Sequence, residues 1–112
     1  MRLIGQLEAG DLSVRIADTV VFEAVFTMEK TYRVPRPEIA SALLSILESP
    51  GVELPGKAAY RQIFALWLQF RGLSFADCYH ATSAMRFTEG VIFSFDKGFD
   101  SVPGIDRRES HR

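Results

Sequence analysis

Apolar residues recur every three or four positions along most of the chain, which is the spacing of amphipathic helices. Together with polar capping residues and glycine or proline stops, this spacing predicts five helices. They cover approximately residues 1–8, 18–32, 38–48, 57–71 and 75–87. Their predicted inward-facing positions are Val21, Val25, Met28 and Tyr32, then Ile39, Leu43 and Ile46, and finally Ile63, Trp67 and Phe70. Glu29 and Arg33, four residues apart, form a predicted surface pair.

Shorter segments with the composition of strands alternate with these helices, at residues 13–17, 52–54, 91–95 and 102–107. The segment Val91–Phe95 is apolar on both faces, which predicts a buried strand of a parallel sheet. The alternation predicts an α/β fold with layers around that sheet. We interpret Trp67 and the phenylalanines as packing residues rather than a platform for stacking bases, because they lie at core spacing.

The length, charge and cysteine content of the chain limit the classes of protein to which it can belong. The 112-residue length suits one domain, residues 1–112, with one core. A net charge of -1 gives no global basic field, so nucleic-acid binding would depend on a local patch. The single cysteine, Cys78, excludes an internal disulfide, is expected to pack as a small apolar side chain and fits a reducing cytoplasm. No apolar run is long enough to cross a membrane.

Three acids, Glu23, Asp77 and Asp96, have surroundings that are unusual for surface carboxylates. Asp96 follows the Val91–Phe95 strand, at the strand end where ligand sites of α/β sheets gather. Glu23 and Asp77 are expected in the first turns of their helices, facing the same crevice. Converging carboxylates repel one another unless a cation neutralises them, and hard oxygen ligands suit Mg²⁺ or Mn²⁺. The set therefore predicts metal-assisted hydrolysis.

Each acid also has a structural interpretation. Asp77 can be the acidic half of a capping box with Ser74, and Asp96 can begin a turn. Glu23 can simply favour the positive end of its helix. His80, one turn from Asp77, is a further candidate ligand, although a lone histidine on a helix is more often structural.

Three segments resemble motifs of the PIN-domain nuclease family, of the kind found as VapC-type toxins. The segment Asp77–Ala84 resembles the family's D-x-x-x-A-x-x-A helix. Ser94–Phe99 resembles its (T/S)-x-D-x-x-F segment, and Val21–Glu23 is similar to the helix that carries its glutamate. The order and spacing of the motifs agree along the whole chain.

The resemblance implies a three-layer α/β/α fold with a parallel sheet and a ribonuclease activity that uses Mg²⁺ or Mn²⁺. Glu23, Asp77 and Asp96 would be the catalytic, metal-holding acids, with Ser94 as a nearby accessory hydroxyl. It also implies the toxin of a toxin–antitoxin pair, with RNA as substrate, an antitoxin protein as partner and a homodimeric state.

One departure from the family qualifies this activity. Family members open with a hydrophobic strand that ends in an aspartate, followed by a first helix, and the sequence has no counterpart of either. We therefore expect an N-terminally truncated domain that lacks the central strand and is a weak or inactive nuclease. The alternative is a non-catalytic remnant that binds an antitoxin-like peptide, or itself, through unpaired strand edges. A third interpretation is an α/β domain without any site.

Overall fold

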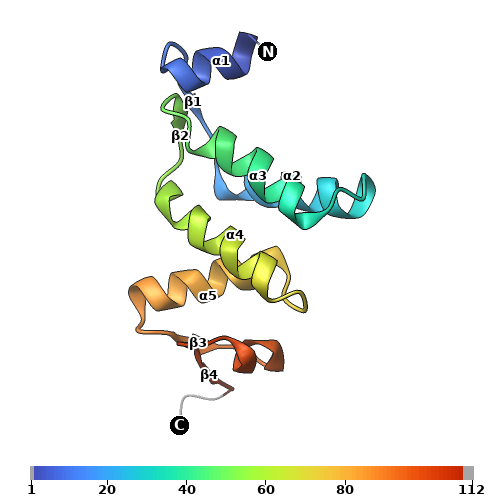
Figure 1. Ribbon diagram of the computed structural model, residues 1–112. Helices are drawn as coiled ribbons and strands as arrows, with labels where there is room; N and C mark the ends of the chain where they lie inside the picture. Colours follow the sequence, from blue (N-terminus) through green and yellow to red (C-terminus); the bar gives the residue numbers. More distant parts are fainter. Residues whose placement is uncertain (1, 110–112) are drawn as a thin grey trace. The chain divides into compact units, whose positions relative to one another are not determined.

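The computed structural model describes residues 2–109. The chain divides into two compact units between residues 61 and 62, and each unit contains one pair of parallel strands (Figure 1). The predicted mixed α/β class with parallel strands is therefore confirmed. In the described residues, however, the strands form two two-stranded sheets in place of the single sheet that we predicted.

The first unit is mainly helical. It contains α1 (Arg2–Ala9), β1 (Val14–Arg15), α2 (Asp18–Phe26), the π-helical segment η1 (Thr27–Thr31), α3 (Arg36–Leu47), β2 (Val52–Glu53) and the 3₁₀ segment η2 (Lys57–Ala59). β1 runs parallel to β2, with Val14 opposite Val52. The core of this unit is formed by Leu7, Val21, Val25, Ile39, Ala40, Leu47, Val52, Leu54 and Tyr60, all of them buried.

The second unit combines two helices with the other strand pair. It contains most of α4 (Tyr60–Gln69), then α5 (Phe75–Phe87), β3 (Val91–Phe93), the 3₁₀ segment η3 (Lys97–Ser101) and β4 (Asp106–Arg108). An aromatic cluster forms its core, in which the Phe75 ring lies 4.8 Å from that of Phe64 and 5.6 Å from that of Trp67. α5 packs against β3, which runs parallel to β4.

A glycine turn leads from α5 into β3. Gly90 has a φ of 86°, and a Cβ there would lie 1.9 Å from the carbonyl oxygen of Gly104, so no other residue allows this approach. The Thr88 hydroxyl donates to the Val91 carbonyl at 2.7 Å, and the Asp106 N–H donates to the Gly90 carbonyl at 2.8 Å. These contacts bring the start of β3 beside the start of β4.

α5 begins at a capping box. The Asp77 N–H donates to the Ser74 hydroxyl at 3.1 Å, and the Ser74 N–H donates to the Asp77 carboxylate at 3.1 Å. Both bonds satisfy backbone donors that a helix start otherwise leaves unpaired. The structural interpretation of Asp77 is therefore confirmed.

The helix boundaries differ from the prediction in several places. α2 follows Ala17 directly and continues into η1, so the helical run ends at Thr31. Tyr32 is 71% exposed, and the prediction that it faces the core is wrong. Glu29 accepts a hydrogen bond from Arg36 at 2.9 Å, whereas the predicted pair with Arg33 is absent from the described contacts. Arg33 lies beyond the helical run, so the i,i+4 geometry does not apply.

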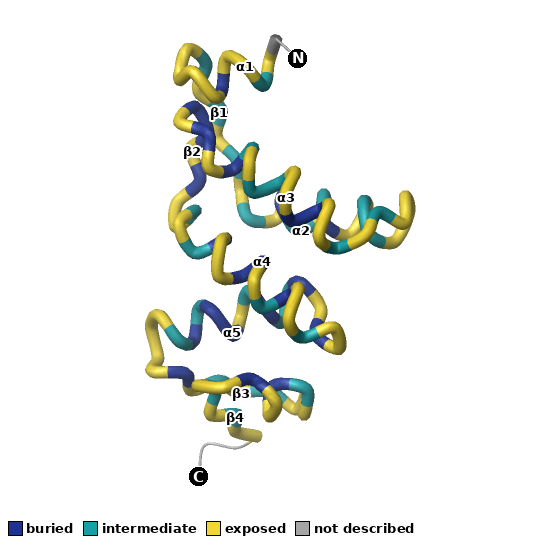
Figure 2. Tube along the Cα trace, in the orientation of Figure 1, coloured by how far each residue is buried: buried dark blue, intermediate teal, exposed yellow. Residues whose placement is uncertain are grey.

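The predicted buried strand is not buried. β3 is parallel as predicted, but Phe93 is 63% exposed and Val91 is also exposed. Figure 2 shows exposed stretches of the chain at β3. The reason is that β3 has one hydrogen-bonded neighbour among the described residues, and α5 covers only part of it. β4 lies at Asp106–Arg108, which overlaps only the end of the predicted segment 102–107.

None of the helices in residues 2–109 combines the length and the hydrophobicity that a membrane crossing requires.

We expect Phe75→Ala to lower the free energy of unfolding by about 3–5 kcal/mol, because it removes a buried ring from the aromatic cluster. Phe87→Ala is the matched control, since Phe87 is 76% exposed and should change the stability by less than about 0.5 kcal/mol. Urea unfolding followed by circular dichroism measures both values. Similar costs for the two variants would contradict the assignment of the core.

We expect Ser74→Ala to cost about 0.5–2 kcal/mol through loss of the cap on α5. Asp77→Asn should cost less, because the amide oxygen of asparagine still accepts from the Ser74 N–H. The same urea titration compares the two variants. A Ser74→Ala protein as stable as the wild type would show that the capping box contributes nothing.

Candidate active site

Asp77 lines a hollow in the second unit. The hollow lies between α5 and β3 and has a volume of about 400 Å³. Asp77, His80 and Ser83 line it from α5, and Phe93 and Ser94 line it from the end of β3. This volume lies within the range of small-molecule sites. Two residues predicted for the site, Asp77 and Ser94, therefore share one cavity.

Asp96 follows Ser94, which lines the hollow, by two residues in the sequence. Its backbone N–H donates to the Ser94 hydroxyl at 3.1 Å, and its carboxylate accepts from the Gly98 N–H at 2.8 Å. The carboxylate therefore caps η3, as the turn interpretation predicts. The side chain is exposed.

The structural bonds of both acids leave capacity for a ligand. Asp77 accepts through Oδ2 and Asp96 accepts through Oδ1, so each described bond uses one oxygen of its carboxylate. A carboxylate has about four lone-pair sites. Capping and cation binding are compatible for both residues, and neither role excludes the other.

Arg107 is the residue that our sequence analysis missed. Its guanidinium donates to both carboxylate oxygens of Asp100, at 2.7 and 3.1 Å, and to Glu109 at 2.6 Å. It also donates to the Ser94 carbonyl at 3.1 Å. Arg107 thereby joins β4 and η3 to the segment that carries Ser94 and Asp96. No motif marks such a residue, because its role depends on the pairing of β4 with β3.

Arg107 and Asp100 stabilise each other's charged forms, and Glu109 adds to the stabilisation of Arg107. The hydrogen bond from Arg107 holds the pKa of the Asp100 carboxyl below its ordinary value. The hydrogen bonds to Asp100 and Glu109 in turn raise the pKa of Arg107. The guanidinium stays charged, and only 11% of the Arg107 side chain is exposed. A fixed positive charge therefore supports the backbone beside Ser94.

Glu23 belongs to the first unit, whereas Asp77 and Asp96 belong to the second. It is exposed and lies in the second turn of α2, because that helix begins at Asp18; our expectation of a first-turn position was wrong. Among residues 2–109, no three His, Cys, Asp or Glu side chains are grouped so that they could hold a metal ion. The convergence of Glu23 with the other two acids stays a prediction.

Two other candidates have simple environments. Cys78 is fully buried and forms no disulfide among the described residues. His80 is exposed at the hollow, with its ring in an edge-on contact with that of Tyr79 at 5.8 Å. It is therefore available to a ligand in the hollow.

The family comparison covers both units. The model of the PIN domain family matches residues 2–105, a range that includes Glu23, Asp77, Ser94 and Asp96. No curated protein and no solved structure gives a significant match. Because the matched range covers nearly the whole chain, this protein belongs to the PIN domain family.

Proposed function

We propose that this chain is an endoribonuclease of the VapC toxin type that uses Mg²⁺ or Mn²⁺. Membership of the PIN family carries the proposal, since its members are typically metal-dependent nucleases and membership implies a nuclease function. Beyond this, we propose that the substrate is RNA, that the protein acts as a toxin and that the metal is Mg²⁺ or Mn²⁺.

Glu23, Asp77 and Asp96 are the proposed metal-holding acids. Their carboxylates are the hard oxygen donors that Mg²⁺ and Mn²⁺ prefer. The shared hollow of Asp77 and Ser94 supports this assignment, as do the carboxylate oxygens of Asp77 and Asp96 that the capping bonds do not use. The Ser94 hydroxyl lies close enough to the backbone of Asp96 to orient it.

The bound ion would lower the pKa of a water molecule and neutralise charge on a phosphodiester. The protein's own contribution is to hold the acids in place. Asp77 is fixed at the first turn of α5, and Asp96 at the start of η3. A fixed carboxylate needs little reorganisation when the substrate arrives, which is the condition for electrostatic catalysis.

The three named acids supply anionic ligands for the ion, and the number of such ligands sets how tightly a divalent cation is bound. The activity of the chain should accordingly depend on the metal concentration.

We expect Asp96→Asn to lower Mg²⁺-dependent RNA cleavage by at least about tenfold, because it weakens a metal ligand while the amide oxygen still accepts from Gly98. Glu23→Gln should have a similar effect. Glu38→Gln, which changes another exposed helix glutamate, is the matched control. A single-turnover assay with labelled RNA, run with Mg²⁺, with Mn²⁺ and with a chelator, measures the rates. Equal rates for Asp96→Asn and the wild type would reject the site.

A second candidate function is a non-catalytic module that binds an antitoxin protein or a second copy of the chain. The observation in its favour is that each strand among the described residues has one hydrogen-bonded neighbour. Strands with an open edge pair readily with other chains.

For this alternative, we expect co-expression with the product of an adjacent gene to give a stable complex, and the chain alone to show no metal-dependent cleavage. Size-exclusion chromatography with light scattering measures the mass of each species. Cleavage that disappears in Asp96→Asn would contradict the alternative, whatever the oligomeric state.

A further inference from the structure

The β3–β4 pair has one face that the rest of its unit leaves exposed. Residues opposite each other in a parallel pair project to the same side, and sides alternate along each strand. Val91 and Phe93 therefore share a face with their partners Asp106 and Arg108. All four residues are exposed, whereas Ile92 and Arg107, which project to the other side, are half-buried.

Two exposed aromatic rings lie together at the end of this face, one on β3 and one in the bend that follows it. Phe93 is 63% exposed and Phe95 is 71% exposed, and their ring centroids lie 5.5 Å apart at an interplanar angle of 76°. Our interpretation of all the phenylalanines as packing residues is therefore wrong at these positions, although it holds for Phe64 and Phe75. Exposed aromatic side chains on the surface of a sheet are the groups on which sheet-based RNA-binding domains stack bases.

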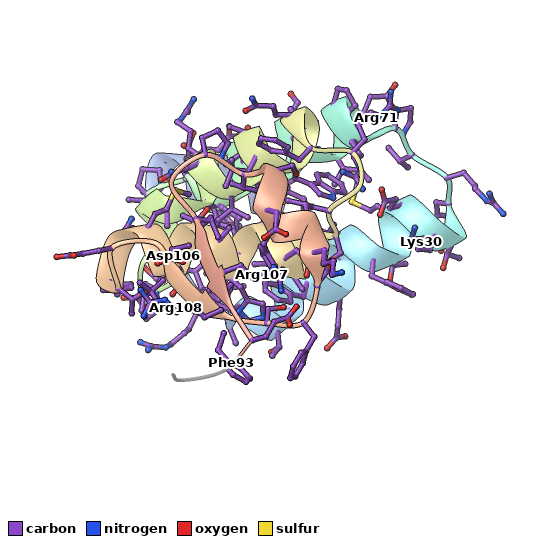
Figure 3. The ribbon with its side chains drawn as sticks, turned by 90° about the horizontal axis from the view of Figure 1, so that it is seen from below. Lys30, Arg71, Phe93, Asp106, Arg107 and Arg108 are labelled. Carbon is purple, nitrogen blue, oxygen red and sulfur yellow. The ribbon has the colours of Figure 1, made fainter. Side chains whose placement is uncertain are left out.

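Positive charge lies beside the rings. Arg108 is the register partner of Phe93, and Figure 3 shows both residues at the β3–β4 pair. Arg108 is bound to Asp106 at 2.8 Å, but both side chains are more than half exposed, so this pair is weak and a phosphate can replace it. Lys97 is exposed and follows Asp96 directly.

The two rings lie next to the candidate active site. Phe93 lines the same hollow as Asp77 and Ser94. Phe95 stands between Ser94 and Asp96 in the sequence. A base stacked on Phe93 would therefore lie at the hollow that Asp77 and Ser94 also line.

We propose that the face formed by Phe93, Phe95 and Arg108 binds single-stranded RNA by base stacking and phosphate contact. The identity of the ligand rests on the proposed ribonuclease function. Stacking is tolerant of sequence because every base has a π-face, so the face should accept many sequences. It should reject duplex RNA, in which the bases are already stacked on each other.

The test measures the binding of a fluorescein-labelled oligoadenylate RNA by anisotropy, with a chelator present so that no cleavage occurs. We expect Phe93→Ala and Phe95→Ala each to weaken binding about fivefold or more. Phe93→Trp should keep the affinity. Tyr32→Ala is the control, because Tyr32 is an equally exposed aromatic residue of the other unit.

The outcomes separate this proposal from the nuclease proposal. If Phe93→Ala weakens RNA binding while wild type and Asp96→Asn cleave equally, the stacking face stands and the metal site fails. If Phe93→Ala binds RNA like the wild type, or Tyr32→Ala shows an equal loss, the stacking face is refuted. Sedimentation velocity tests whether the face is instead a protein interface. A wild-type protein that does not bind RNA but forms a dimer, which Phe93→Ala disrupts, would overturn the proposal.

Discussion

The parallel pairing of β3 with β4 is the constraint on which the candidate site of the second unit depends. The pairing sets the register that brings Arg107 beside the end of β3, where its guanidinium binds the Ser94 carbonyl, Asp100 and Glu109. In another register, Arg107 could not make these contacts, and they would no longer hold the segment that carries Ser94 and Asp96. Gly90 is part of the same constraint, because its close approach to Gly104 leaves no room for a side chain. The placement of Ser94 and Asp96 thus depends on a residue and a turn outside the proposed set of metal-holding acids.

Local signals were sufficient to predict the helices and the environments of two acids. The capping box of Ser74 and Asp77 spans three residues, and the turn at Asp96 spans two, so both are encoded by neighbours in the sequence. Helix spacing likewise located the buried positions of the first unit, such as Val21, Val25 and Ile39. Interactions of this range need no knowledge of the tertiary fold.

Several of the failures involve partners that only the fold supplies. Glu29 binds Arg36 across the bend that follows η1, and a helical i,i+4 rule cannot anticipate it. Arg107 depends on a strand pairing across 13 residues, since it reaches Ser94. The apolar sequence of β3 predicted burial on both faces, but burial requires a layer on each side, and the described residues supply one strand and one helix. Hydrophobicity indicates what a strand can bury and leaves open what covers it.

The dual role that we propose for the capping carboxylates bears on how such sites are recognised. The hydrogen bonds of Asp77 and Asp96 give each residue a structural explanation, which accounts for its position without any chemical role. A helix cap or turn, however, occupies one oxygen and restricts the rotation of the side chain, which is what a metal ligand also requires. Glu23 differs, because it lies exposed in the second turn of α2 and no cap orients it. If the three acids act together, Asp77 and Asp96 contribute preorganised oxygens, and Glu23 pays the larger entropic cost of being ordered by the ion.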